Sequence, residues 1–315
     1  MEKLRIVFMG TPDFAVGILD TIYQNNYEIV GVITAPDKPA GRGQKVSTSA
    51  VKEYAVSKNL TLLQPTNLKS EDFLTELRSL KANLQVVVAF RMLPETVWKM
   101  PKLGTFNLHA SLLPEYRGAA PINWAIINGE TKTGVTTFFI DDKIDTGAMI
   151  LCKETAIGSN ESAGELHDRL MQLGSQIVID TLELIETGEA TTTIQKENSD
   201  IKTAYKLNKD NCKIDWTQSG TTIYNLIRGL SPYPAAWTYI KDDENEWNVK
   251  IYAASFEKKE PNEVIGKITS TKKEIFITTK DGILKITSLQ FPGKKRMLAH
   301  ELLNGISFSE NTIVL

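Results

Sequence analysis

The chain has few cysteines and no long apolar run. Its 315 residues include only two cysteines, Cys152 and Cys212, which lie far apart in the sequence. This excludes a disulfide framework and the paired ligand spacing of a structural metal site. No apolar stretch reaches the roughly 18 residues that suggest a membrane span, and the N-terminus lacks a secretory signal pattern. We therefore expect a cytoplasmic protein with no metal and no membrane association.

The chain also lacks an excess of charge of one sign. It has 36 Lys and Arg against 38 Asp and Glu, a net charge of −2, and 42% of its residues are hydrophobic. Such a composition is ordinary for a globular chain that buries a core, and the length favours two domains. From Lys206 onward, basic residues outnumber acidic ones by 16 to 13. This mild asymmetry does not by itself indicate a nucleic-acid partner.

Apolar runs of strand length alternate with helical patterns in the first part of the chain. Strands that are buried on both faces give such continuous runs in a mostly parallel sheet, because helices cover both sides. The expected strands are Leu4–Met9, Glu28–Ala35, Leu84–Phe90, Thr105–His109, Gly134–Ile140 and Ala148–Lys153, and the expected helices include Phe14–Tyr23 and Ser162–Thr187. The alternation predicts an α/β fold with a Rossmann-like, doubly wound, mostly parallel sheet.

The pattern changes after residue 189. Residues 190–208 are polar and weakly patterned, which favours a linker between a domain at 1–189 and a second domain at 209–315. The second domain has one helical pattern near Gly220–Leu230. Its short β segments, separated by turns, are Ala236–Ile240, Val249–Ala253, Val264–Ser270, Glu274–Thr279 and Ile283–Leu289. Five short strands of this kind predict a small OB-like β-barrel.

Three polar side chains stand out within residues 106–147. Asn107 and His109 are two residues apart on an expected strand, so both side chains point to the same face at its carboxyl end, where ligands bind in open α/β sheets. Asp145 lies in a loop after the next strand. An Asn amide or a protonated His can stabilise an oxyanion, a His can move protons, and an Asp can orient it. This set predicts direct acyl transfer to an amine.

Two other classes of protein compete with that interpretation. A single histidine on a strand is more often a structural residue than a catalyst, and a non-catalytic RNA-binding module would need no such trio. A dinucleotide-dependent oxidoreductase would need a G-x-G-x-x-G motif after the first strand, but residues 9–13 read MGTPD. The combination of Asn107, His109 and Asp145 therefore favours an enzyme of the acyl-transfer class.

Longer motifs identify a resemblance to a known family. The sequence resembles the 10-formyltetrahydrofolate-dependent formyltransferases through HASLLPEYRGAAP at 109–121 and DTG at 145–147. The resemblance covers essentially the whole chain. Further matching motifs are MGTPDFAV at 9–16, TAPDKPAGRGQK at 34–45, VVVAF at 86–90, IDW at 214–216, KDGIL at 280–284 and LQFPGKKRM at 289–297.

The resemblance implies a role for each matching position. It makes Asn107, His109 and Asp145 the catalytic trio and 10-formyltetrahydrofolate the formyl donor. It implies that two segments contact the folate, namely Ser111, Leu112, Leu113 and Pro114 in one turn and Phe90, Arg91, Met92 and Leu93 in another loop. The second loop departs from the pattern of the tRNA-formylating members. It carries Arg91 and looks one residue shorter, as in glycinamide ribonucleotide transformylases, which puts individual pterin contacts in doubt.

Within this family the acceptor implied most directly is initiator methionyl-tRNA. The Pro- and Gly-rich loop at 35–45 could contact phosphates through Lys38, Arg42 and Lys45, although a solvated surface loop would look similar. A second basic turn, formed by Lys294, Lys295 and Arg296, could extend that contact. The residues of both basic groups are expected to bind tRNA. The chain is expected to act as a monomer.

Three related activities remain as alternatives. A sugar-nucleotide amine N-formyltransferase would share the catalytic block and the folate donor. A glycinamide ribonucleotide transformylase would typically lack the C-terminal barrel. A folate-dependent hydrolase would use water in place of the amine.

Overall fold

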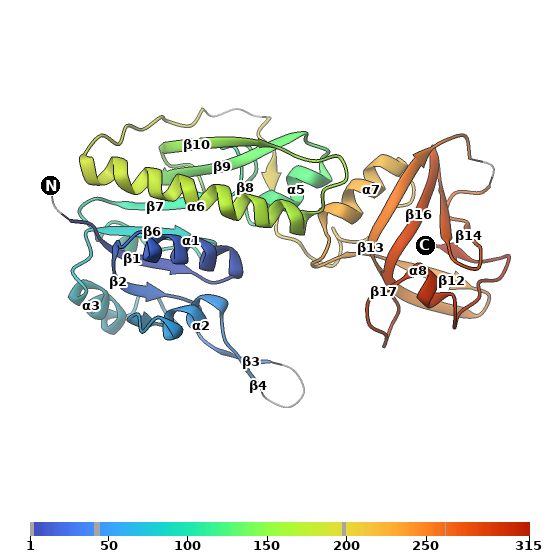
Figure 1. Ribbon diagram of the computed structural model, residues 1–315, viewed down its shortest axis with the longest axis horizontal. Coiled ribbons are helices and arrows are strands. Elements are labelled where there is room, and N and C mark those ends of the chain that lie inside the picture. Colours follow the sequence, from blue (N-terminus) through green and yellow to red (C-terminus); the bar gives the residue numbers. More distant parts are fainter. Residues whose placement is uncertain (1–2, 41–44, 197–199, 262) are drawn as a thin grey trace. The chain divides into compact units, whose positions relative to one another are not determined.

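The structure, a computed structural model of the chain, describes residues 3–40, 45–196, 200–261 and 263–315. It divides into two compact units (Figure 1). The first contains residues 1–121, 133–155 and 167–203, and the second contains residues 122–132, 156–166 and 204–315. The domain boundaries expected from the sequence, at 189 and 208, stay a prediction.

A seven-stranded sheet forms the centre of the first unit, with strand order β10-β9-β7-β6-β1-β2-β5. Its strands are β1 (Arg5–Gly10), β2 (Glu28–Ile33), β5 (Leu62–Leu63), β6 (Leu84–Val88), β7 (Thr105–His109), β9 (Lys132–Phe139) and β10 (Met149–Ala156). The strands from β5 to β7 are parallel, while β9 runs antiparallel to β7. The predicted Rossmann-like, mostly parallel sheet is therefore confirmed.

Helices cover both faces of this sheet (Figure 1). They are α1 (Asp13–Gln24), α2 (Ala50–Ser57), α3 (Glu71–Ser79), α4 (Glu95–Trp98) and α6 (Ala163–Thr187), and the short elements are β3 (Lys38–Ala40), β4 (Lys45–Ser47), β8 (Arg117–Gly118), α5 (Pro121–Ile127) and β11 (Thr203–Ala204). A Cβ added at Gly174 of α6 would lie 2.8 Å from a methyl of Leu108, so α6 packs directly on β7. On the other face, Phe73 and Leu77 of α3 share a core cluster with Val87. Within the described residues no helix, α6 included, has the length and apolarity to cross a membrane.

The strand order reverses next to β1. The chain builds β2 and β5 on one side of β1 and then crosses to place β6 and β7 on the other side. Gly10 pairs with Val88, and Val88 pairs with Leu108, so β1, β6 and β7 end side by side. Ligands of open α/β sheets bind at such a switch point, outside the carboxyl ends of the strands. This edge brings the segments after Val88 and Leu108 together.

The second unit is an antiparallel, nearly closed barrel with an attached helix. Its elements are α7 (Gly220–Gly229), β12 (Ala236–Asp242), β13 (Asn245–Lys258), β14 (Ile268–Ser270), β15 (Ile275–Thr279), β16 (Gly282–Gln290), β17 (Met297–Leu298), α8 (Ala299–Leu302) and β18 (Ile313–Val314). The strand order is β14-β15-β16-β13-β12-β18, and a bridge between Lys267 and Ile313 joins its two ends. The predicted OB-like barrel is confirmed.

Two strands of the barrel depart most from their expected bounds. The expected strand at 264–270 begins only at Ile268, because Lys267 N donates to Val264 O in a turn where Gly266 adopts a φ of +83°. The expected strand at 249–253 is part of the 14-residue β13. The register between β13 and β16 shifts on either side of Ala253. Such irregularities bend a strand, which allows one long strand to follow the curvature of a barrel.

Asp242 at the end of β12 attaches the C-terminal segment to the barrel. Its Oδ1 accepts hydrogen bonds from Thr312 Oγ1 at 2.7 Å and from Ser309 N at 3.1 Å, and the residue is only 8% exposed. These bonds favour the carboxylate and lower the pKa of Asp242, with the contacts from Ser309 as the largest cause. Because the folded pKa is lowered, this stabilisation is present above the unfolded pKa of about 3.9 and is lost as pH falls through the folded value.

We expect the Asp242→Asn variant to be less stable than the wild type at pH 7. The difference between their free energies of unfolding should shrink as pH falls below about 4, where the carboxylate of the unfolded wild-type chain takes up a proton before that of the folded protein. Urea unfolding of both proteins at a series of pH values measures this difference. Asp210→Asn, a change at an exposed position of the same unit, is the matched control. If the difference in the free energy of unfolding stays constant down to acid pH, the Asp242 carboxylate does not stabilise the fold in this way.

Candidate active site at the carboxyl edge of the sheet

Strand β7 carries the first two residues of the predicted trio. Asn107 pairs with Val87 of β6 on one side and with Phe138 of β9 on the other, so its backbone is fixed within the sheet. Its side chain is half-buried and makes no hydrogen bond to any described residue. Because successive side chains of a strand alternate between the faces, Asn107 and His109 share a face. Strand β7 therefore holds Asn107 in place, and the side-chain amide of Asn107 is available to donate hydrogen bonds to a ligand.

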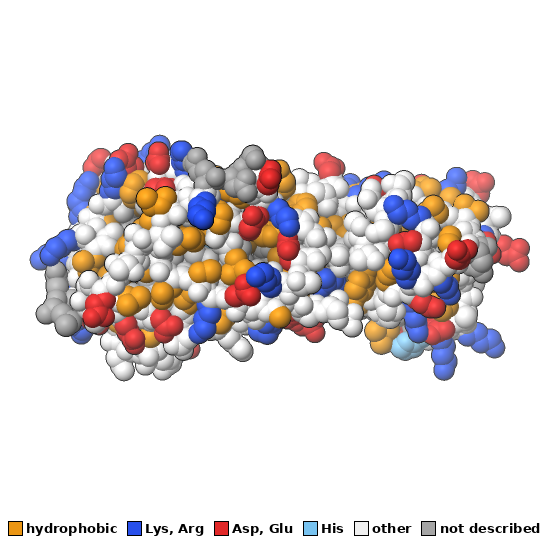
Figure 2. Space-filling model, turned by 90° about the horizontal axis from the view of Figure 1, so that it is seen from above, with side chains coloured by type: hydrophobic (Ala, Val, Ile, Leu, Met, Phe, Trp, Pro, Cys, Tyr) orange, Lys and Arg blue, Asp and Glu red, His pale blue; other side chains and the backbone are white. Residues whose placement is uncertain are grey.

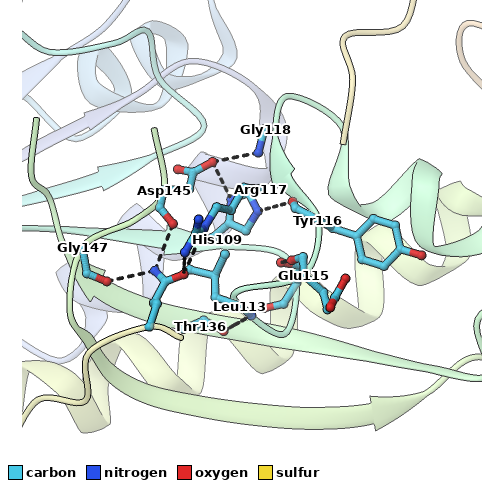
Figure 3. A network of polar contacts seen from close by, with 11 residues as sticks. His109, Leu113, Glu115, Tyr116, Arg117, Gly118, Thr136, Asp145 and Gly147 are labelled. Atoms are coloured by element: carbon cyan, nitrogen blue, oxygen red, sulfur yellow. Dashed lines mark hydrogen bonds and ion pairs between the residues drawn. The ribbon is translucent and has the colours of Figure 1, made fainter. Parts of the chain in front are cut away.

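The ring of His109 has a defined orientation. His109 is 6% exposed, and its Nε2 lies 2.8 Å from the carbonyl oxygen of Tyr116 (Figure 3). A carbonyl oxygen can only accept, so Nε2 carries the proton and Nδ1 is the nitrogen free to take one up. Tyr116 is buried, adopts a φ of +61°, and its own N–H donates to Lys202 O at 2.6 Å.

Asp145 faces the free nitrogen of that ring. Its Oδ2 lies 3.7 Å from His109 Nδ1 and accepts a hydrogen bond from Gly118 N at 2.9 Å (Figure 3). Asp145 has a left-handed φ of +56°, a conformation that Asp adopts more readily than most residues. The loop before it is organised by Asp141, whose Oδ1 accepts from Thr146 Oγ1 at 2.7 Å. The structure thus brings His109 and Asp145 of the predicted trio together, and Asn107 lies two residues before His109 on the same strand.

Gly147 follows Asp145 where the backbone approaches β9 closely. A Cβ at Gly147 would lie 1.7 Å from Phe139 O, a distance that no side chain can occupy. The neighbouring Ala148 O accepts a hydrogen bond from Phe139 N at 3.0 Å. The glycine of the DTG motif is therefore required by packing, and it fixes where the chain turns two residues after the carboxylate.

The expected folate-contacting turn at 111–114 is held by its neighbours. Ser111 is fully buried, and its Oγ donates to Glu115 O at 2.6 Å. Thr136 Oγ1 donates to Ser111 O at 2.7 Å and accepts from Leu113 N at 3.3 Å (Figure 3). Leu113 is buried, whereas Leu112 and Pro114 are half-buried. The turn begins two residues after His109, so it lies at the same edge of the sheet.

The second expected folate loop, Phe90 to Leu93, starts at the end of β6 next to the switch point. Phe90 is half-buried and Met92 is 68% exposed, while Leu93 is 7% exposed and belongs to the core. Arg91 donates to Thr66 O at 3.1 Å and to Pro65 O, and partial burial lowers the pKa of its guanidinium. Arg91 thus ties the loop to the segment after β5.

The basic hairpin formed by β3 and β4 carries the first group of expected tRNA contacts. Lys38 is exposed and pairs with Ser47, Lys45 begins β4, and Arg42 lies outside the described residues. At the base of the hairpin Asp37 forms an ion pair with Lys52 and accepts from Gln64 Nε2 at 2.8 Å. The hydrogen bond from Lys52 is the largest cause that lowers the pKa of Asp37.

The second basic group, Lys294 to Arg296, is exposed in a turn after β16. Arg296 Nε donates to Ser288 Oγ at 3.0 Å, and its guanidinium lies 4.6 Å from the ring centre of Tyr252. Figure 2 shows acidic and basic side chains interspersed over the face in view. Charge on that face does not by itself indicate a nucleic-acid partner, in agreement with the net charge of −2.

Two contributors to this site could not be predicted from the sequence. One is the carbonyl of Tyr116, which fixes the ring of His109. The other is Gln195, a buried residue in the segment expected to be a linker, which contacts the Asp145 loop. A main-chain oxygen has no sequence signature, and a lone glutamine in a polar segment has no periodicity. Within the described residues no group of three or more His, Cys, Asp or Glu side chains is arranged to hold a metal.

The arrangement can support transfer of an acyl group. An available amide donor, a histidine with one free nitrogen and a carboxylate facing that nitrogen lie at the end of one strand. The amide can stabilise a developing oxyanion, the free nitrogen can accept a proton, and the carboxylate can stabilise the resulting imidazolium.

Comparison with known proteins agrees with this chemistry. The family described as "Formyl transferase" matches residues 4–182, and "Formyl transferase, C-terminal domain" matches residues 206–307. The methionyl-tRNA formyltransferase of Flavobacterium johnsoniae is 71% identical over 314 residues, covering 100% of both chains. That of Flavobacterium psychrophilum is 67% identical over 315 residues, again covering 100% of both.

The fold also occurs in a solved structure with a different acceptor. WlaRD, a sugar 3N-formyl transferase crystallised in the presence of dTDP and 5-N-formyl-THF, aligns with a TM-score of 0.63 at 24% identity. The alignment covers 94% of this chain and 100% of that one. At this identity the likeness shows a common fold.

Proposed function

This chain belongs to the methionyl-tRNA formyltransferase family, and from that membership we propose that it transfers the formyl group of 10-formyltetrahydrofolate to the methionine amine of initiator methionyl-tRNA. The product, N-formylmethionyl-tRNA, serves translation initiation. The observation that carries the proposal is the 71% identity that extends over the whole of both chains. A cytoplasmic location follows from this role.

The reaction exchanges one carbon–nitrogen bond for another. The amine nitrogen attacks the formyl carbon to form a new C–N bond, and the bond between that carbon and the folate nitrogen breaks. The attacking amine loses one proton, and the folate nitrogen gains one. During attack the formyl oxygen takes on negative charge, and the half-buried amide of Asn107 is the donor we assign to it.

His109 and Asp145 are assigned to the proton transfers. Because Nε2 of His109 donates to Tyr116 O, we assign Nδ1 as the atom that takes the proton from the amine and returns one to the leaving nitrogen. The resulting imidazolium faces Asp145 Oδ2, 3.7 Å from Nδ1. The carboxylate can therefore stabilise the positive charge that the ring carries during the proton transfer.

The folate and the tRNA are assigned to different segments of the chain. The loops at 90–93 and 111–114 follow β6 and β7 at the switch point, which supports a folate site there. Phe90 is half-buried and Met92 is exposed, and we assign both side chains to contact with the pterin. The hairpin residues Lys38, Arg42 and Lys45 and the turn residues Lys294 to Arg296 are proposed to contact tRNA phosphates.

The alternative acceptors have weaker support. The sugar formyltransferase WlaRD shares the fold at 24% identity, whereas the methionyl-tRNA formyltransferases of two Flavobacterium species share 71% and 67% of residues over the full length.

Formyl transfer by the purified protein tests the proposal. With 10-formyltetrahydrofolate as donor, we expect rapid formylation of charged initiator tRNA. Charged elongator tRNA, an amino-sugar nucleotide and glycinamide ribonucleotide should be poor acceptors under the same conditions. Activity on a small amine with none on tRNA would keep the fold and the trio but overturn the acceptor.

A further inference from the structure

The segment that follows α6 packs against the two loops that carry the candidate active site. This segment, defined here as residues 193–196 and 200–203, belongs to the first unit. At one end Thr193 and Met149 exchange two backbone hydrogen bonds of 2.8 and 2.9 Å. At the other end Lys202 O accepts from Tyr116 N, and Lys202 N donates to Glu115 Oε2 at 2.9 Å. It therefore contacts both the turn that orients His109 and the strand after the Asp145 loop.

Gln195 makes the central contacts of this segment, and it is only 5% exposed. Its Nε2 donates to Asp145 O and to Gly147 O, both at 2.9 Å. Its Oε1 accepts from Arg117 Nη2 at 2.7 Å and from Arg117 Nε at 3.1 Å. The amide of Gln195 thus joins two segments. One is the loop that carries Asp145, and the other is the turn next to Tyr116, whose carbonyl accepts a hydrogen bond from the His109 ring.

We infer that Gln195 is a positioning residue. It fixes the separation of His109 and Asp145 by tying the Asp145 loop to the turn at Tyr116 and Arg117, where the carbonyl of Tyr116 holds the His109 ring. The left-handed backbone of Asp145 needs support from its surroundings, and the bond from Gln195 Nε2 to its carbonyl provides that support. The inference rests on the proposed function, since it concerns the same reaction.

The donating end of the amide can be changed while the accepting end is kept. In Gln195→Glu the oxygen that accepts from Arg117 remains, but the second carboxylate oxygen faces the carbonyl oxygens of Asp145 and Gly147 and repels them. The change therefore releases the Asp145 loop while keeping the Arg117 contact. Gln195→Met, of similar size and without charge, removes all four hydrogen bonds. It gives a second measurement if the Glu variant fails to fold.

We expect Gln195→Glu to lower kcat for formyl transfer to initiator methionyl-tRNA by about tenfold to 10²-fold, because a shift of about 1 Å in a catalytic group has such an effect. KM for the tRNA and for the folate should stay unchanged, since the residue touches neither assigned binding segment. Gln176→Glu, which introduces the same charge on the exposed face of α6, should retain wild-type kcat.

A spectroscopic measurement separates positioning from general destabilisation. The chain has three histidines, so the ring nitrogens of ¹⁵N-histidine-labelled protein give three sets of signals. In both Gln195 variants we expect the signals of His109 to move and those of His167 and His300 to stay in place. Unchanged His109 signals and wild-type kcat in folded variants would overturn the inference. A wild-type protein that formylates no tRNA would overturn the proposed function instead, while the histidine spectra would still test the positioning.

Discussion

Replacement of His109 with alanine is expected to lower kcat for formyl transfer by about 10³-fold, within the range for loss of a general acid–base group. Nδ1 of the ring lies 3.7 Å from Asp145 Oδ2, and the second nitrogen, Nε2, is committed to Tyr116 O. The effect should fall on kcat, because the ring acts on protons that move only during the reaction. Single-turnover rates with saturating folate and tRNA measure it directly.

The control for this variant is His300→Ala, a change at an exposed position in the second unit, which should leave kcat unchanged. The double variant His109→Ala/Asp145→Ala adds a second test. Residues that act as one unit have non-additive effects, so the double variant should lose little more than His109→Ala alone. A His109→Ala enzyme with kcat close to that of the wild type, or additive losses in the double variant, would contradict the assigned roles.

Gly147→Ala is expected to reduce both stability and activity. The added methyl would lie 1.7 Å from Phe139 O, so the loop must move away from β9. Forced displacement of packed backbone is expected to lower the free energy of unfolding by about 3 kcal/mol. The movement also displaces Asp145, two residues earlier, and kcat of the folded enzyme should fall by about 10²-fold.

Urea unfolding and formylation kinetics of the same preparation measure the two effects together. Gly305→Ala is the matched control, because a Cβ at Gly305 meets no atom within 4 Å and no unusual φ is required there. We expect that control to stay within about 0.5 kcal/mol of the wild type. If Gly147→Ala behaves like Gly305→Ala, the close approach at Phe139 does not position the carboxylate.

The parallel part of the fold follows from the sequence because its strands are buried on both faces. LQVVVAF predicts β6, and TFNLH predicts β7. The end of β6 is less predictable, since the chain leaves the sheet at Ala89, which adopts a φ of +47° despite its apolar neighbours. In the barrel, the irregular register around Ala253 depends on the curvature of the sheet. Tertiary structure decides both features.

Part of the candidate site could likewise be predicted from the sequence, and part depends on tertiary contacts. Asn107 and His109 could be paired from their spacing on one strand, and Asp145 could be added from its place in the loop after the next strand. The resemblance then made the three a catalytic trio. Gln195 could not be found in this way, because it lies 78 residues from Arg117 in the sequence and within a polar stretch without periodicity. The tautomer of His109 depends on a main-chain carbonyl at Tyr116, which any residue type could supply. Long-range contacts to the backbone leave no pattern in the sequence.

The anchor beneath the β3–β4 hairpin has a consequence for protein engineering. Asp37 binds both Lys52 and Gln64 at the base of the hairpin, outside the ten residues from Lys38 to Ser47. A hairpin from a relative with another acceptor can be grafted between Asp37 and Thr48 without removing the ion pair that supports it. Given the tRNA contact proposed for the hairpin, such a graft tests whether acceptor choice can be exchanged separately from the chemistry at β7.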